Sequence, residues 1–211
     1  MIFFGTEILS NILHLISSTL LIPVIVALLC FIIYAILCLG GFITEKFSRN
    51  TPTISETEQL IRNISQSTSP EKIHQHIAES ILSENFKKVL KTITNNHDIG
   101  PEAREALADK LIEEEELKYT KKTTKTDILL KLGPTLGLMG TLIPLGPGLG
   151  ALGTGDITTL SQALLIAFDT TVTGLTAATI GYLISRYRKQ WYNDDLSLLD
   201  SLTTTLLETL K

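Results

Sequence analysis

The sequence predicts an all-α integral membrane protein with three transmembrane helices and extended cytoplasmic helices. Charged residues make up only 19% of its 211 residues, whereas soluble domains carry about 25%. All 18 Lys and Arg residues lie within residues 46–131 or within residues 186–211. The stretches outside these two regions are long enough to cross a hydrocarbon core of about 30 Å, which takes about 20 helical residues.

The N-terminal region supplies two of the expected elements. Residues 1–18 place polar side chains every three or four positions, which predicts an amphipathic helix at the outer membrane interface. Residues 19–43 contain no Lys, Arg, Asp or Glu and form the expected first transmembrane helix. A signal peptide explains this run less well, because the run lacks a basic n-region and is too long.

Residues 44–126 are expected to form a cytoplasmic helical segment. Pro70 begins a helix that we expect to run to about Thr92, and the pair Gly100 and Pro101 opens a second helix. The acidic run at residues 113–116 is expected to lie on a solvated helix face.

The remaining elements are two further spans and a C-terminal helix. Residues 127–153 and 157–185 form the expected second and third transmembrane helices, and residues 186–211 form a cytoplasmic helix. Leucines at strict i+4 spacing predict a stripe that packs on a neighbouring helix. These leucines are Leu198, Leu202, Leu206 and Leu210. An aromatic and basic anchor is expected at the inner interface, formed by Arg186, Tyr187, Arg188, Trp191 and Tyr192.

The distribution of basic residues predicts the orientation. By the positive-inside rule the N-terminus and the link between the second and third spans lie outside, and the basic segments lie in the cytoplasm. Both basic regions are neutral overall, so the net charge of −4 corresponds to four remaining carboxylates, which favour a cation path. These are Glu7, Glu45, Asp156 and Asp169.

The composition also excludes several classes of protein. An almost even charge balance argues against a nucleic-acid binder. Two cysteines exclude a disulfide scaffold and a Cys-rich zinc site, and the four histidines are too scattered for a metal site. The sequence shows no nucleophile with a base and no phosphate loop with its lysine. We therefore expect neither enzymatic activity nor a cofactor.

The second span has an unusual composition for a lipid anchor. Residues 132–155 hold eight of the chain's 14 glycines and three of its seven prolines. Glycines four residues apart let another backbone approach closely, and prolines free carbonyls that need other partners in a dry environment. The expected helix-packing residues are Gly133, Gly137, Gly140, Gly146, Gly150 and, in the third span, Gly174.

The third span carries a carboxylate, Asp169, within a polar stripe. An Asp at mid-span costs roughly 2.5–3.5 kcal/mol, so it is retained where it faces protein or water. Gln162, Thr173 and Thr176 share its stripe on a helical wheel. Asp169 is therefore either part of a proton or cation path or a paired packing residue.

Two motifs in these spans resemble those of a known family. The stretch around PTLGLMGTL, residues 133–145, and the stretch around TTVTGLTAAT, residues 163–182, are similar to the second-span and third-span motifs of the MotA/TolQ/ExbB proton channel family. The resemblance implies pore threonines at Thr141 and Thr171, and a homopentamer in the plasma membrane of a prokaryote. It also implies a single-span partner subunit like MotB, ExbD or TolR within that pentamer.

The resemblance and the polar stripe favour different pore-facing residues. Asp169 and Thr171 are about 200° apart on an ideal helix, so they cannot point to the same place. The leading hypothesis is a channel-forming subunit of an ion-driven motor or energy transducer. In this hypothesis Thr141 and Thr171 line the path, and Asp169, Thr173 and Thr176 assist. The alternative is a non-conducting membrane scaffold whose cytoplasmic helices recruit a partner.

Overall fold

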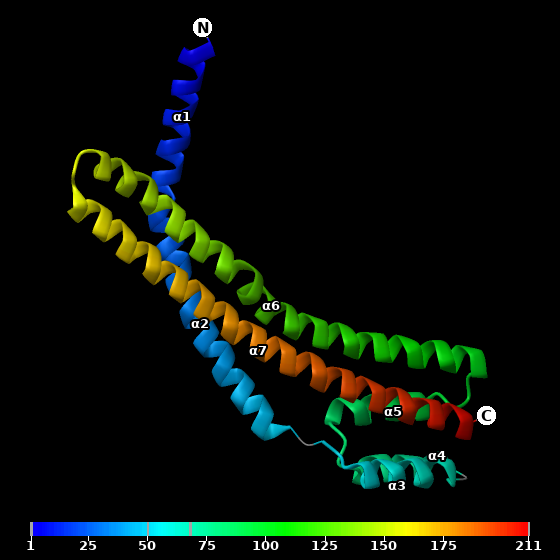
Figure 1. Ribbon diagram of the computed structural model, residues 1–211. Helices are drawn as coiled ribbons and strands as arrows, with labels where there is room; N and C mark the ends of the chain where they lie inside the picture. The colour runs from blue at the N-terminus through cyan, green and yellow to red at the C-terminus, as the bar shows by residue number, and fades with distance from the viewer. Residues whose placement is uncertain (1, 50, 68, 211) are drawn as a thin grey trace. The chain divides into compact units, whose positions relative to one another are not determined.

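The chain is helical throughout the part that the structure describes. The computed structural model describes the backbone of residues 2–49, 51–67 and 69–210, and the side chains of these ranges from Ile8 onward. Within them seven helices follow one another, without a strand (Figure 1). The helices are α1 (Ile2–Thr19), α2 (Leu21–Ser48), α3 (Ile54–Ser65), α4 (Pro70–Glu79), α5 (Glu84–Asn95), α6 (Pro101–Gly153) and α7 (Ile157–Thr209).

Three helical stretches of the described residues are long and apolar enough to cross a membrane. They are Ile8–Ser48, Pro101–Gly153 and Ile157–Thr209, which confirms the prediction of three membrane-length helices. The last two contain 53 residues each. At a rise of about 1.5 Å per residue, each is about 80 Å long, more than twice the hydrocarbon thickness. Helices α6 and α7 therefore each combine a span with a long extension.

The chain divides into two compact units, which we describe separately. Unit 1 comprises Met1–Ile43 and Thr124–Arg186, and unit 2 comprises Thr44–Thr123 and Tyr187–Lys211. Unit 1 thus contains the apolar parts of α2, α6 and α7. Unit 2 contains the polar helices α3 to α5 together with the first part of α6 and the last part of α7.

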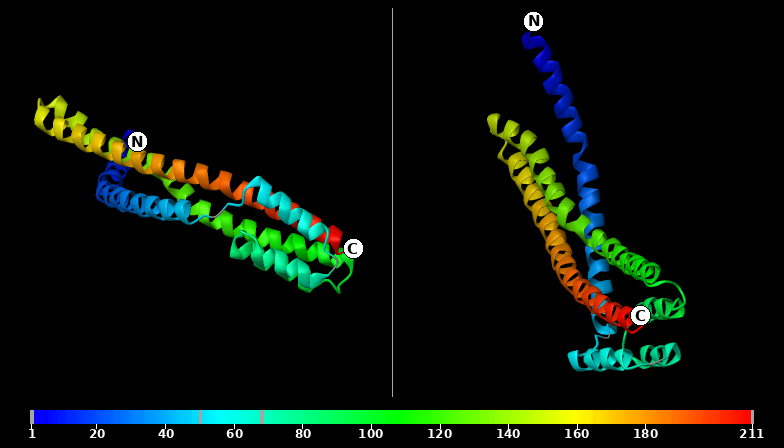
Figure 2. Two further views of the ribbon diagram at one scale, coloured as in Figure 1. Left: turned by 90° about the horizontal axis from the view of Figure 1, so that it is seen from below. Right: turned by 90° about the vertical axis from the view of Figure 1, so that its right-hand side faces the viewer.

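In unit 1, α6 and α7 run side by side in opposite directions from a tight turn (Figures 1 and 2). Gly155 in this turn has a φ of 79°, a conformation that glycine adopts without strain. Asp156 then caps α7, because its carboxylate accepts hydrogen bonds from the backbone N–H of Thr159, at 3.1 Å, and from the Thr159 hydroxyl. Asp156 therefore has a capping role that the charge pattern alone did not reveal.

Helix α2 packs on this pair through an apolar cluster centred on two alanines and a leucine. Ala35 of α2, Leu129 of α6 and Ala177 of α7 are fully buried together. Cys38 lies at the edge of this cluster, and both cysteines are free thiols.

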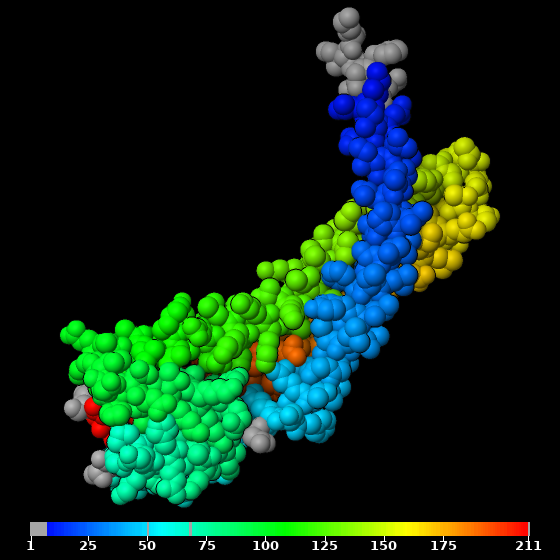
Figure 3. Space-filling view, turned by 180° about the vertical axis from the view of Figure 1, so that it is seen from behind, coloured from blue at the N-terminus to red at the C-terminus, as the bar shows by residue number. Residues whose placement is uncertain are grey.

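Unit 2 has its own apolar core, in which α3, α4 and α5 pack with the first part of α6 and the last part of α7. Figure 3 shows the outer surface that the short helices and the first part of α6 form together. Leu199, Leu202 and Leu206 of α7 are fully buried in it, with Leu198 and Leu210 at its edge. This confirms the predicted packing stripe and extends it to Leu199, which the strict i+4 pattern omitted.

Two local expectations for unit 2 were wrong. The helix expected from Pro70 to about Thr92 is interrupted, because the backbone leaves α4 at Ser80 and restarts at Ser83. The Ser83 side chain accepts a hydrogen bond from the backbone N–H of Phe86 at 3.4 Å and so caps α5. Within the acidic run, Glu115 is only 3% exposed. Four consecutive helical residues span a whole turn, so one of them faces the packed side of α6.

Candidate functional site

A seam of small residues lets α6 and α7 approach closely in unit 1. A Cβ atom added at Gly174 would lie 2.5 Å from the carbonyl oxygen of Gly133 and 3.0 Å from the Cα of Gly137. A Cβ added at Gly133 would lie 2.7 Å from the carbonyl oxygen of Gly174. Backbone atoms cannot move aside as flexible side chains can, so the two helices meet here only because these three residues are glycines.

The seam continues toward the turn between the two helices. Gly140 lies against Thr170, whose side chain would be 2.5 Å from an added Cβ, and Gly148 lies against Ala163 at 2.8 Å. Gly148 was not among the predicted packing residues. Gly146 and Gly150 have no atom within 4 Å of an added Cβ. A packing role for these two glycines stays a prediction.

The two threonines implied by the family resemblance border this seam at the same level. Thr141 follows Gly140, which faces Thr170, and an added Cβ at Gly137 would lie 3.5 Å from the Cα of Thr171. Both Thr141 and Thr171 are half-buried. Each of these threonines therefore lies next to a residue of the seam, Thr141 on α6 and Thr171 on α7.

Their hydroxyl protons are already used within the helices. Thr141 donates to the carbonyl oxygen of Leu138 at 2.7 Å, and Thr171 donates to that of Ala167 at 3.0 Å. A hydroxyl that has donated its proton still has lone pairs that accept hydrogen bonds. These oxygens thus favour a donor such as water or a hydronium ion.

The polar stripe of the third span lies on a different face of α7. Asp169 and Thr176 are exposed in this chain, Gln162 is exposed, and Thr173 is half-buried. The Thr173 hydroxyl donates to the backbone carbonyl of Asp169 at 2.7 Å. The chain thus presents the seam threonines and the Asp169 stripe as two separate polar features, as the helical geometry predicts.

The prolines of α6 add further acceptor oxygens near Thr141. Pro134, Pro144 and Pro147 all lie inside the continuous helix. Because proline has no N–H, Pro144 removes the donor that an α-helix would offer to the carbonyl of Gly140. The carbonyl oxygen of Gly140 is therefore a further acceptor one residue before Thr141.

Comparison with models of protein families identifies the family of the chain. A model of the MotA/TolQ/ExbB proton channel family matches residues 73–201, which run from α4 into the last part of α7. The chain belongs to this family. A search of curated proteins gave no significant match. Membership makes the chain a multi-pass membrane protein of a proton channel family and associates it with ion-driven energy transduction.

This MotA/TolQ/ExbB protein has a polar contact at one end of its unit 1 helix pair that the sequence reasoning missed. The Ser185 hydroxyl donates to the Asp127 carboxylate at 2.5 Å, joining α7 to α6. Ser185 is 3% exposed, and the neighbouring Thr126 is fully buried. The signal in the sequence was an acidic residue between two lysines, Lys125 and Lys131, at the start of an apolar span.

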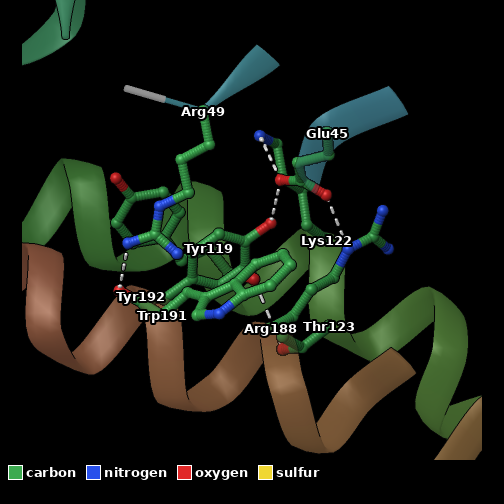
Figure 4. Close-up of polar contacts among 8 residues, drawn as sticks. All are labelled: Glu45, Arg49, Tyr119, Lys122, Thr123, Arg188, Trp191 and Tyr192. Atoms are coloured by element: carbon green, nitrogen blue, oxygen red, sulfur yellow. Dashed lines mark hydrogen bonds and ion pairs between the residues drawn. The ribbon is translucent and has the colours of Figure 1, made fainter. Parts of the chain in front are cut away.

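A second polar cluster of the MotA/TolQ/ExbB protein lies in unit 2 and is centred on Glu45 (Figure 4). The Glu45 carboxylate pairs with Arg188 at 2.8 Å and with Lys122 at 3.8 Å, and it accepts a hydrogen bond from the Tyr192 hydroxyl at 2.6 Å. Tyr119 stacks on Tyr192, with ring centroids 4.1 Å apart. The cluster therefore ties the end of α2 to α6 and α7.

Arg49 continues this cluster on the other side of the tyrosines. Its guanidinium donates to Asp195 at 2.5 Å and to the backbone carbonyl of Trp191 at 3.0 Å, and it lies 5.1 Å from the centre of the Trp191 ring. Burial raises the pKa of the Asp195 carboxyl, and the positive charge of Arg49 lowers it by less.

This cluster corrects one sequence expectation and leaves another a prediction. Arg188, Trp191 and Tyr192 contact other side chains of the protein, whereas Arg186 and Tyr187 are exposed. An anchor of these five residues at the inner interface stays a prediction. Glu45 does not contribute to an acidic outer path, because Arg188 and Lys122 neutralise it. The side chain of Glu7 lies outside the described residues.

Metal ligation finds no support in the described part of the chain. No group of three or more His, Cys, Asp and Glu side chains there is arranged to hold a metal ion.

Proposed function

We propose that this chain is the channel-forming subunit of a proton-driven membrane motor or energy transducer. It acts as a homopentamer in the plasma membrane of a prokaryote and encloses a single-span partner of the MotB, ExbD or TolR kind. The observation that supports the proposal is the tight packing of Gly137 and Gly140 of α6 on Thr170 and Thr171 of α7, next to which Thr141 lies in the sequence.

In this proposal the threonine oxygens form acceptor positions for a hydrated proton. Their own protons are held by the carbonyl oxygens of Leu138 and Ala167, so the remaining lone pairs favour species that donate hydrogen bonds. Asp169 supplies a negative charge on α7 one helical turn before Thr173, and Thr173 and Thr176 extend the polar path along the same face.

The driving force for such a path is the membrane potential together with the proton gradient. Moving one elementary charge across 100 mV releases about 2.3 kcal/mol. In the proposed mechanism, proton movement between the pentamer and its enclosed partner drives one component relative to the other.

Proton flux in liposomes tests the proposal. The tagged chain is purified in mild detergent together with the single-span protein that accompanies it, and flux is followed with an enclosed pH-sensitive dye under an imposed potential. We expect flux from the complex and a large loss of flux for Thr171→Val and for Asp169→Asn. Thr179→Val is the matched control, because Thr179 lies on the same helix, is exposed, and also donates to its own helix at 2.8 Å.

The outcomes separate the channel from the scaffold alternative. A complex that forms with its partner but gives no partner-dependent flux contradicts the channel. Unchanged flux in both variants contradicts the assigned residues. A non-conducting scaffold predicts instead that Asp169→Asn leaves partner recruitment and cellular function intact.

A further inference from the structure

An acidic groove in unit 2 lies between the first part of α6 and the last part of α7. Its cavity volume is about 300 Å³, at the lower end of the range for ligand pockets. Ile112 and Leu207 contribute apolar surface to its lining. Carboxylates of both helices line it, from Glu105, Asp109, Asp200 and Glu208.

These four carboxylates are available for a ligand. All are exposed, and among the described residues none of them forms an ion pair or a hydrogen bond. Arg104 is the one cationic side chain in the lining. Four negative charges against one positive charge leave the groove with a formal charge of −3, which attracts a cationic group.

Two buried polar side chains also line the groove, and each keeps one polar atom without a hydrogen-bond partner. Arg104 is 4% exposed and Thr203 is 3% exposed. The Arg104 guanidinium donates through Nη1 to the carbonyl of Leu210 at 2.7 Å and through Nη2 to that of Ile99 at 3.2 Å. Its Nε and the Thr203 Oγ1 have no hydrogen-bond partner. A buried polar atom without a partner is unfavourable, so turning the Thr203 hydroxyl toward an acceptor on a ligand lowers the free energy.

We propose that this groove binds a Lys- or Arg-containing peptide segment of another protein. The cationic side chain lies among the carboxylates, and a backbone carbonyl of the segment accepts from the Thr203 hydroxyl once that side chain turns toward the groove. A peptide is the ligand class that combines a cation with a carbonyl acceptor. Anionic ligands such as nucleic acid are repelled by the formal charge, and no described carboxylate group is arranged for a metal ion.

A second copy of this chain fits the groove less well. Residues 101–116 of α6 contain seven acidic residues and two basic ones. A copy held in the same membrane orientation presents this same acidic stretch at the level of the groove, where like charges repel. The occupant is therefore assigned to a different protein.

Peptide binding to the full-length chain in detergent micelles tests the proposal. The probe is a fluorescein-labelled penta-arginine peptide, and binding is followed by fluorescence anisotropy. The groove variant is Asp109→Asn with Asp200→Asn. The matched control is Glu114→Gln with Glu116→Gln, which removes two exposed charges of α6 that do not line the groove.

We expect the groove variant to bind the probe about tenfold more weakly and the control to bind almost as the natural chain does. Thr203→Val should also weaken binding, although it leaves the charge unchanged. Equal weakening in both double variants would show general attraction to an acidic chain and overturn the proposal. Absence of probe binding to the natural chain would overturn it too, as would a groove variant that changes only the mass of the detergent-solubilised oligomer.

Discussion

Glu45 and Asp195 show how neighbouring residues give two carboxylates of unit 2 opposite pKa shifts. Burial raises the pKa of Glu45, but the hydrogen bond from Tyr192 and the positive charge of Arg188 outweigh it, so the net pKa is lowered. Burial also raises the pKa of Asp195, and its ion pair with Arg49 does not compensate. The ionised form of Glu45 is thus favoured by the fold, whereas that of Asp195 is disfavoured.

The first prediction concerns the acid stability of unit 2. The pKa of Glu45 in the fold lies below its ordinary value of 4.5, so its stabilising contribution is present above that value and is lost as the pH falls through the lowered pKa. Asp195 has the opposite effect on stability. Its pKa is raised by burial, so protonation at lower pH removes the free-energy cost of a buried negative charge. Glu45→Gln should lower the thermal unfolding temperature at neutral pH and flatten its decline toward about pH 3.

Circular dichroism of the detergent-solubilised protein measures this effect. Glu58→Gln is the control, because Glu58 is exposed and pairs only with Arg62 on the surface of α3. In this control the unfolding temperature should fall with decreasing pH as steeply as it does in the natural chain. If the unfolding temperature of Glu45→Gln fell equally steeply with decreasing pH, this would contradict the claim that ionised Glu45 stabilises unit 2.

At the scale of elements, α6 and α7 pack by different means along their lengths. In unit 1 they meet through backbone contacts between glycines, which suits a lipid environment where apolar burial drives association little. In unit 2 they pack through leucines such as Leu202 and Leu206, which are fully buried. Truncating these leucines creates a cavity in the core. Such variants therefore report on folding of unit 2 and not on partner recruitment.

The glycine seam gives the second prediction. Gly174→Ala places a Cβ 2.5 Å from a backbone oxygen, so the helices must separate, at a cost of roughly 1–3 kcal/mol. Gly41→Ala is the control, since an added Cβ at Gly41 has no atom within 4 Å. Unfolding of the detergent-solubilised chain by dodecyl sulfate should occur earlier for Gly174→Ala only. Identical transitions for both variants would exclude a tight seam.

At the scale of the whole molecule, the three membrane-length helices predict that the two ends of the chain lie on opposite sides of the membrane. The turn Thr154–Asp156 joins the two spans of α6 and α7, and the basic residues lie in the stretches assigned to the cytoplasm by the positive-inside rule. The orientation with the N-terminus and this turn outside remains a prediction from charge.

Cysteine labelling tests this orientation. In a chain with Cys30→Ser and Cys38→Ser, a single cysteine is introduced by Thr154→Cys or by Ser201→Cys, both at exposed positions. A membrane-impermeant maleimide added to intact cells should label the variant at position 154 and leave the one at position 201 unlabelled until the cells are lysed. The reverse pattern would invert the topology.

The sequence by itself determined the three membrane-length helices, the special composition of the second span and the family. A span crosses the hydrocarbon core in consecutive residues, so its length and its low content of charge appear as a local run in the sequence. The motif around Thr141 and the motif around Thr171 were sufficient to indicate the MotA/TolQ/ExbB family, which the match over residues 73–201 then established.

The tertiary structure decided which residues meet. It paired Gly133 with Gly174, neutralised Glu45 with Arg188 and buried Glu115 on the packed side of α6. Composition and periodicity could not give these contacts, because each depends on how two helices are aligned along their axes. Shifting one helix by a single residue turns a different side chain toward the partner helix, and only packing of the whole chain fixes that alignment.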